Sequence, residues 1–62
     1  MNDHEKDLMA KRYTNWEVAM FTIMHIKKAS ATSDESIRKQ ELKSARIYLT
    51  VLDHKLKELE NV

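Results

Sequence analysis

The chain has 62 residues, a formal net charge of +1 and no cysteine, glycine or proline. The lack of cysteine excludes disulfides and zinc sites built on thiolates, and a net charge of +1 is too small for a general attraction to polyanions or membranes. The lack of glycine and proline disfavours a strand-rich fold, because tight turns between short strands use these residues. We therefore predict one small all-α domain over residues 1–62. The lack of cysteine fits an intracellular protein, and we expect a cytoplasmic location.

A first helix is predicted over about residues 3–29. Asn2 or Asp3 can serve as its N-cap, and acidic residues follow in the first turn. Apolar residues then recur at steps of four, three, four and three, which is the a/d pattern of a helix that packs on one side. These residues are Met9, Tyr13, Trp16, Met20 and Ile23. Lys27 and Lys28 follow the pattern and suit a helix C-terminus.

A connection at about residues 30–33 and a second helix at about 34–60 complete the predicted architecture. Thr32 and Glu35 have the spacing of a capping box, and Ser33 is the competing N-cap. The second helix carries a longer a/d pattern than the first. Its members are Leu42, Ala45, Leu49, Leu52, Leu56 and Leu59.

The two a/d patterns match each other if the chain folds back near Thr32. In such a fold, residues of the two helices whose numbers add up to 65 lie opposite each other. Each a/d residue of the first helix then lies opposite an a/d residue of the second, for example Trp16 opposite Leu49 and Met20 opposite Ala45. We therefore predict an antiparallel two-helix hairpin. In this arrangement Trp16 lies in the core, and Trp16→Ala is predicted to unfold or dissociate the protein.

Five apolar residues lie outside the two a/d patterns. They are Val18, Phe21, Met24, Ile47 and Val51. Together they are expected to form an exposed patch of the kind that marks an interface, so we predict a homodimer in which two hairpins form a four-helix bundle. The alternative is that this patch binds a foreign partner. Residues 24–46 carry a net charge of +3, which leaves −2 for the rest of the chain and favours antiparallel pairing.

No arrangement of catalytic residues is evident, and we predict that the protein is not an enzyme. There is no Ser/His/Asp order and, without glycine, no glycine-rich phosphate loop. His54 has Glu58 four residues further on, which makes one pair and not a metal site. We expect no metal or cofactor, and we predict that His4, His25 and His54 are solvated or interface residues.

The predicted function is binding to another protein, as a small regulator or inhibitor that uses a helical face. The alternative is RNA or DNA binding by the tip of the hairpin, where cations neutralise phosphates. The cations of this tip are Lys27, Lys28, Arg38, Lys39, Lys43 and Arg46. In size and topology the chain resembles the Rop family, small helical hairpins that dimerise into four-helix bundles and bind paired RNA loops. This resemblance implies RNA binding by a dimer.

The segment 37–43 resembles the start of the second helix in small helical-hairpin aspartyl-phosphate phosphatases, which carry a Ser-Gln-Glu-Leu-Asp motif. Gln40, Glu41 and Leu42 match the middle of that motif. Lys39 and Lys43 stand where the family has the serine and the aspartate, and the family's activity depends on the aspartate. The resemblance therefore implies a related shape without phosphatase activity.

Overall fold

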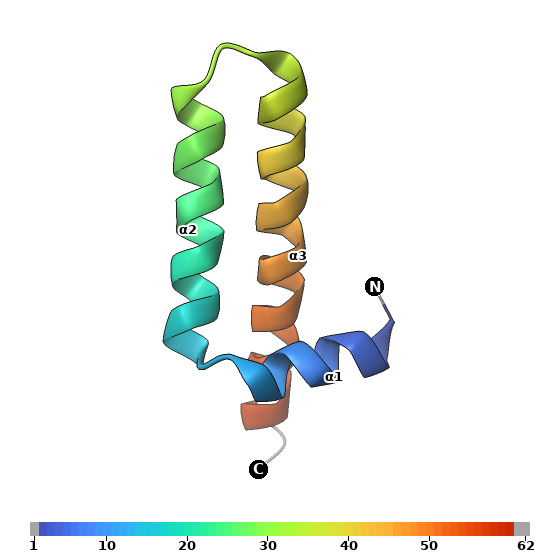
Figure 1. Cartoon of the computed structure of the whole chain (residues 1–62). Coiled ribbons are helices and arrows are strands. Elements are labelled where there is room, and N and C mark those ends of the chain that lie inside the picture. The colour runs from blue at the N-terminus through green and yellow to red at the C-terminus, as the bar shows by residue number, and fades with distance from the viewer. Residues whose placement is uncertain (1, 61–62) are drawn as a thin grey trace.

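The computed structural model describes residues 2–60, and this part of the chain is all-α, as predicted. Three helices follow one another along it: α1 (Asp3–Arg12), α2 (Asn15–Ala31) and α3 (Glu35–Glu60). Figure 1 shows α2 and α3 side by side and running in opposite directions, with α1 lying across the open end of the pair. No helix of the described residues has the length and apolar content that a membrane span requires.

The predicted single helix over residues 3–29 is wrong, because the chain leaves the helix at Tyr13 and Thr14. A capping box explains the break. The Thr14 hydroxyl accepts a hydrogen bond from the backbone N–H of Glu17 (3.1 Å), and the Glu17 carboxylate accepts one from the backbone N–H of Thr14 (2.9 Å). These bonds satisfy two backbone donors that would otherwise lack a partner at the start of a helix. The described chain thus has three helices in place of the predicted two.

Single polar side chains cap the other helix starts. Asn2 accepts a hydrogen bond from the backbone N–H of Glu5 (2.8 Å) and caps α1, which is one of the two predicted choices. Asp34 caps α3 by accepting hydrogen bonds from two backbone N–H groups of its first turn (2.9 and 3.2 Å). The predicted capping box of Thr32 and Glu35 is therefore wrong, and Thr32 is instead the C-cap of α2.

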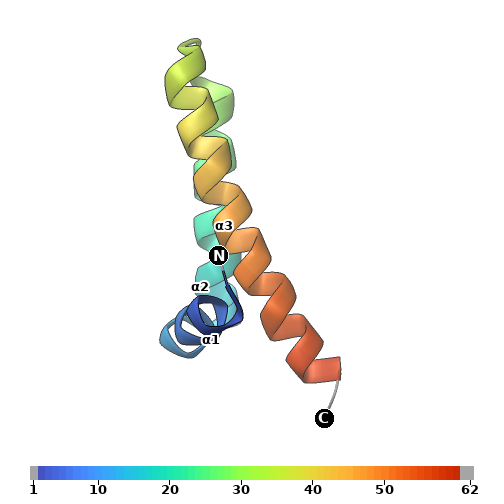
Figure 2. The ribbon, with the colours of Figure 1, turned by 90° about the vertical axis from the view of Figure 1, so that its right-hand side faces the viewer.

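Lys55 of α3 holds the C-terminal end of α1. Its ammonium group donates hydrogen bonds to the backbone carbonyl oxygens of Ala10 (2.6 Å) and Tyr13 (2.8 Å). A cation suits this position, because the last carbonyl groups of a helix are free acceptors with partial negative charge. Figure 2 shows α1 nearly end-on at the N-terminal end of α2, while the C-terminal part of α3 inclines away from both.

The contact between α2 and α3 is built from small side chains. Val18 and Val51 are fully buried, at 0% exposure. The other buried residues of the described chain are Thr22, Ala29 and Ala45. The Thr22 hydroxyl donates a hydrogen bond to the carbonyl oxygen of Val18 (2.9 Å), so the one buried polar side chain of residues 2–60 is satisfied within its own helix.

Aromatic rings extend this contact toward α1. The Phe21 ring packs edge-on against Tyr13, with ring centroids 5.3 Å apart, and lies tilted against Tyr48, with centroids 5.1 Å apart. His25 stacks on Tyr48 at 5.6 Å and forms a hydrogen bond with Glu41. In the two pairs that join the helices, Phe21–Tyr48 and His25–Glu41, the residue numbers add up to 69 and 66, whereas the predicted register requires 65. The helices are therefore shifted along each other by no more than about one turn from the prediction.

The faces predicted to form the contact are wrong, even though the register is close. Trp16 is 70% exposed, and most other a/d residues of the two long helices are exposed as well: Met20, Ile23, Leu42, Leu49, Leu56 and Leu59. Val18 lies two residues from Trp16, about 200° around the helix, so burial of Val18 turns Trp16 away from α3. Periodicity did not distinguish the two faces, because α2 is apolar on nearly all sides.

Candidate functional site

The residues predicted to mediate self-association do not form one exposed patch. Val18 and Val51 are covered within a single chain and offer no surface to a second one, which corrects their assignment to a patch. Phe21 is half-buried among the aromatic rings. Met24 and Ile47 are exposed. A partner molecule can therefore contact α2 and α3 only through surfaces other than the predicted patch.

One uncovered apolar surface lies along α3 and the C-terminal half of α2. Leu42, Leu49 and Leu56 recur every seven residues, so they form one line along α3, and each is about half exposed (46–55%). Ile26 of α2 is exposed to the same degree. We call these four residues the aliphatic face.

The aliphatic face points away from α1. His54 lies beside Asp7 of α1, and Leu56 follows His54 by two residues, about 200° around α3. On α2, Met24 lies one turn from Phe21 and therefore on the side of the helix that carries the aromatic rings. Ile26 is two residues from Met24, about 200° around α2, and so lies on the other side. The side that α1 covers and the side that carries the leucine line are therefore opposite sides of the molecule.

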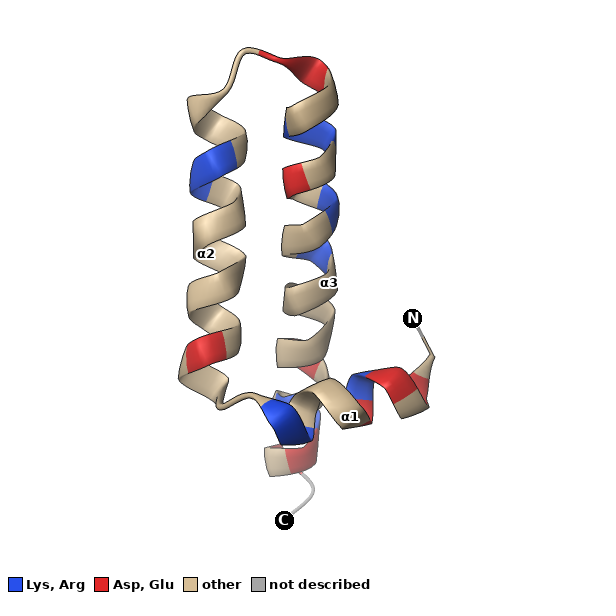
Figure 3. Cartoon of the chain, in the orientation of Figure 1, with Lys and Arg blue, Asp and Glu red and all other residues tan. Residues whose placement is uncertain are grey.

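The cations of the predicted basic tip do not all lie on one surface, although Lys39, Lys43 and Arg46 recur at helical spacing along one outer side of α3. Lys27 and Lys43 each lie two residues from a buried alanine, so both point away from the contact between α2 and α3, toward opposite outer sides. Arg38 donates a hydrogen bond to the carbonyl oxygen of Thr32 (3.0 Å) and belongs to the connection. Figure 3 shows that the basic segments of α2 and α3 lie mostly in the half next to the connection. The remaining three cations are exposed: Lys28, Lys39 and Arg46.

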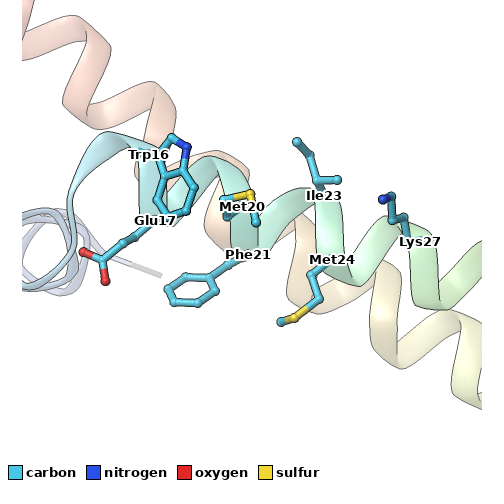
Figure 4. A pocket seen from close by; sticks show the side chains of 7 residues that line it. All are labelled: Trp16, Glu17, Met20, Phe21, Ile23, Met24 and Lys27. Carbon is cyan, nitrogen blue, oxygen red and sulfur yellow. The ribbon is translucent and has the colours of Figure 1, made fainter.

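A second uncovered surface is a groove along the outer side of α2, which we call the tryptophan groove. Figure 4 shows two rows of side chains along it: Trp16, Met20, Ile23 and Lys27 in one row, and Glu17, Phe21 and Met24 in the other. The hollow has a volume of about 410 Å³. Its lining is apolar except for Glu17 and Lys27, near its two ends. Trp16 is the largest side chain of the protein, and most of its surface is available for contact with another molecule.

Neither surface was predicted from the sequence as it stands, because Trp16, Met20 and Ile23 of the groove and the three leucines of the aliphatic face had been assigned to the core, while Phe21 and Met24 had been assigned to the self-association patch. Side-chain size distinguishes the residues buried between α2 and α3 from the exposed residues of the two surfaces. The buried residues of α2 and α3, Val18 and Ala29 on one helix and Ala45 and Val51 on the other, are small and let the helices approach closely, whereas Trp16 is too large for such a contact.

The structure gives the three histidines different surroundings. His25 lies between α2 and α3, where its Nδ1 forms the hydrogen bond with Glu41, so it supports the fold. His4 is exposed on α1. His54 lies beside Glu58, as its spacing indicated, and also beside Asp7. No sequence pattern pointed to Asp7, because the crossing of α1 over α3 was not predicted.

Comparisons of the chain with models of protein families, with curated proteins and with solved structures found no match.

Proposed function

We propose that the protein is a small non-enzymatic regulator or inhibitor that acts by binding another protein through an apolar helical face. The observation that carries this proposal is the amount of large apolar surface left uncovered on so short a chain. Among the described residues, twelve large apolar side chains are exposed and only four apolar residues are buried. Contiguous apolar surface of this kind marks interaction sites on soluble proteins.

The occupant that we propose for the aliphatic face is a second copy of the chain, which gives a four-helix bundle. Leucines spaced by seven form the contact line of a coiled coil, and a two-fold axis sets such a line against itself. In the antiparallel arrangement the half with net charge +3 lies beside the half with −2 of the other copy. Association also adds apolar burial to a core that is marginal in a chain of this size.

Leu49→Lys is expected to abolish this self-association. Leu49 is 55% exposed at the middle of the leucine line, and the substitution places two like charges in a symmetric interface. Because each Leu49 has only about half of its surface left to bury, losing it from both copies costs about 2–3 kcal/mol, which raises the dimer Kd by about 30-fold or more. Sedimentation velocity over a concentration series measures this Kd.

Leu8→Lys is the matched control, because Leu8 is 54% exposed but lies on α1. It is expected to leave the dimer Kd within about threefold of the wild type, a change of under 1 kcal/mol. Far-ultraviolet circular dichroism checks that both variants keep their helices. A wild-type chain that stays monomeric throughout the series, or a Leu49→Lys variant that dimerises normally, would rule out the aliphatic face as the dimer contact.

The occupant that we propose for the tryptophan groove is an amphipathic helix of a partner protein. Ile23 is the groove residue next to Ile26, one turn away on α2, and the other lining residues lie further round the helix, so pairing of the aliphatic faces covers only that edge of the groove. Met20 and Met24 have flexible, polarizable side chains that adapt to differently shaped ligands. In helix-in-groove contacts the apolar face of an amphipathic helix lies in an apolar groove. Lys27, at one end of this groove, favours a bound helix that carries an acidic residue beside it.

Trp16→Glu is expected to abolish capture of the partner, because it removes the largest apolar side chain of the groove and adds a charge. Immobilised wild type, Trp16→Glu and Leu8→Glu are compared for the proteins that each retains from a lysate of the source cells. A partner bound in the groove is retained by wild type and Leu8→Glu and lost from Trp16→Glu. Identical retention by all three proteins would contradict the proposed site.

A further inference from the structure

Three metal-ligating side chains from two helices meet where α1 crosses α3. Nε2 of His54 lies 3.4 Å from Oε1 of Glu58 and 3.9 Å from Oδ1 of Asp7. One ligand atom of each of the three residues lies within 4.8 Å of those of the other two. His54 and Glu58 are one turn apart on α3, whereas Asp7 is supplied by α1.

These separations fit a small tetrahedral ion. With ligand bonds of about 2.1 Å, tetrahedral coordination holds neighbouring donor atoms about 3.4 Å apart. The histidine–glutamate distance has this value already, and the histidine–aspartate distance exceeds it by an amount that a small side-chain rotation removes. The backbone of the two helices therefore already brings the three side chains within reach of one ion.

The ring nitrogen at the centre of this cluster lacks a partner. Within residues 2–60, Nε2 of His54 is buried and has no hydrogen-bond partner, although two carboxylates lie near it. A buried polar atom without a partner is costly, and such atoms in native proteins usually have an explanation. A metal ion on the lone pair of Nε2 provides one, because neutral imidazole is a common ligand of transition metals.

Asp7 is held in an orientation that leaves one oxygen available. Lys11 pairs with its Oδ2 (3.0 Å), while Oδ1 is the oxygen that faces His54. Outer-sphere partners of this kind commonly fix the orientation of a ligating carboxylate.

We propose that Asp7, His54 and Glu58 bind one divalent transition-metal ion, with zinc as the expected metal. Three protein ligands leave a fourth position for water, which suits zinc. The imidazole ligand favours zinc over magnesium or calcium, which select oxygen ligands. A hollow of about 290 Å³, lined in part by Asp7 and Glu58, gives the fourth ligand room. The bound ion joins α1 to α3, and this proposal does not rest on the proposed function.

Calorimetric titration of the metal-free, untagged chain with zinc chloride tests this site. The expected result is one zinc ion per chain and a rise in melting temperature, because the ion binds the folded chain preferentially. His54→Gln and Glu58→Gln are expected to weaken zinc binding by more than the 10–100-fold that the loss of an outer-sphere partner typically costs. Magnesium chloride at the same concentrations is expected to produce no such shift.

Glu60→Gln is the matched control, because Glu60 is an exposed carboxylate in the same last turn of α3. It is expected to bind zinc as the wild type does, with a Kd within about threefold, under 1 kcal/mol. Circular dichroism confirms that each variant is helical before titration. Absence of zinc binding to the wild type, or equal binding by wild type and His54→Gln, would overturn the proposal.

Discussion

Val51→Asp is expected to unfold the chain at neutral pH. Val51 is fully buried in the contact between α2 and α3, and no cation is among the buried residues of the described chain. An unpaired charge left in a protein interior costs about 3–5 kcal/mol, which equals the whole stability that a core of this size usually supplies. Loss of the helical circular dichroism signal and of a cooperative urea transition measures the effect.

Ile47→Asp is the control for this substitution. Ile47 lies one turn earlier on α3 and is 36% exposed, so the added carboxylate can reach water, unlike one at the fully buried Val51. Exposed substitutions usually change stability by about 0.5 kcal/mol or less. A Val51→Asp chain that unfolds at the same urea concentration as Ile47→Asp would mean that α2 and α3 do not pack through their small residues.

Tyr48→Ala is expected to lower the free energy of unfolding by about 3–5 kcal/mol, the usual range for removal of a packed aromatic side chain. The Tyr48 ring contacts both Phe21 and His25, so its removal leaves two other rings without their packing partner. Urea unfolding followed by circular dichroism gives the free energy. The protein concentration is kept low, so that association does not contribute to it.

Trp16→Ala provides the contrast, because the sequence predicted that this substitution would be the most severe. In the structure Trp16 is 70% exposed, so its loss is expected to change the stability of the single chain by about 0.5 kcal/mol or less. If Trp16→Ala proved more destabilising than Tyr48→Ala, then Trp16 and not Tyr48 would belong to the core.

The features that the sequence predicts correctly are those that depend on local chemistry. The absence of glycine and proline, together with the apolar periodicity, indicates an all-α chain, and Asn2 is a suitable N-cap because its side chain reaches a free backbone N–H. The break at Thr14 was also detectable, since Thr14 and Glu17 have capping-box spacing. It was missed because Tyr13 and Trp16 continue the apolar pattern across it.

The choice of contacting faces was not predictable from periodicity alone. α2 offers Trp16 and Met20 on one face and Val18 and Thr22 on another, and both sets recur at helical spacing. Packing decides between them, because two helices approach more closely over small side chains. The meeting of Asp7 with His54 was unpredictable for a different reason, namely that it depends on the angle at which α1 leaves α2.

The attachment of α1 has a consequence for motion. α1 buries none of its own residues, and the hydrogen bonds that hold its C-terminal end to α3 come from the single ammonium group of Lys55. A segment secured in this way can detach at low free-energy cost while the rest stays folded. Its backbone amides are therefore expected to exchange earliest with solvent deuterium among those of the three helices, and chemical neutralisation of Lys55 is expected to loosen α1 from an otherwise intact molecule.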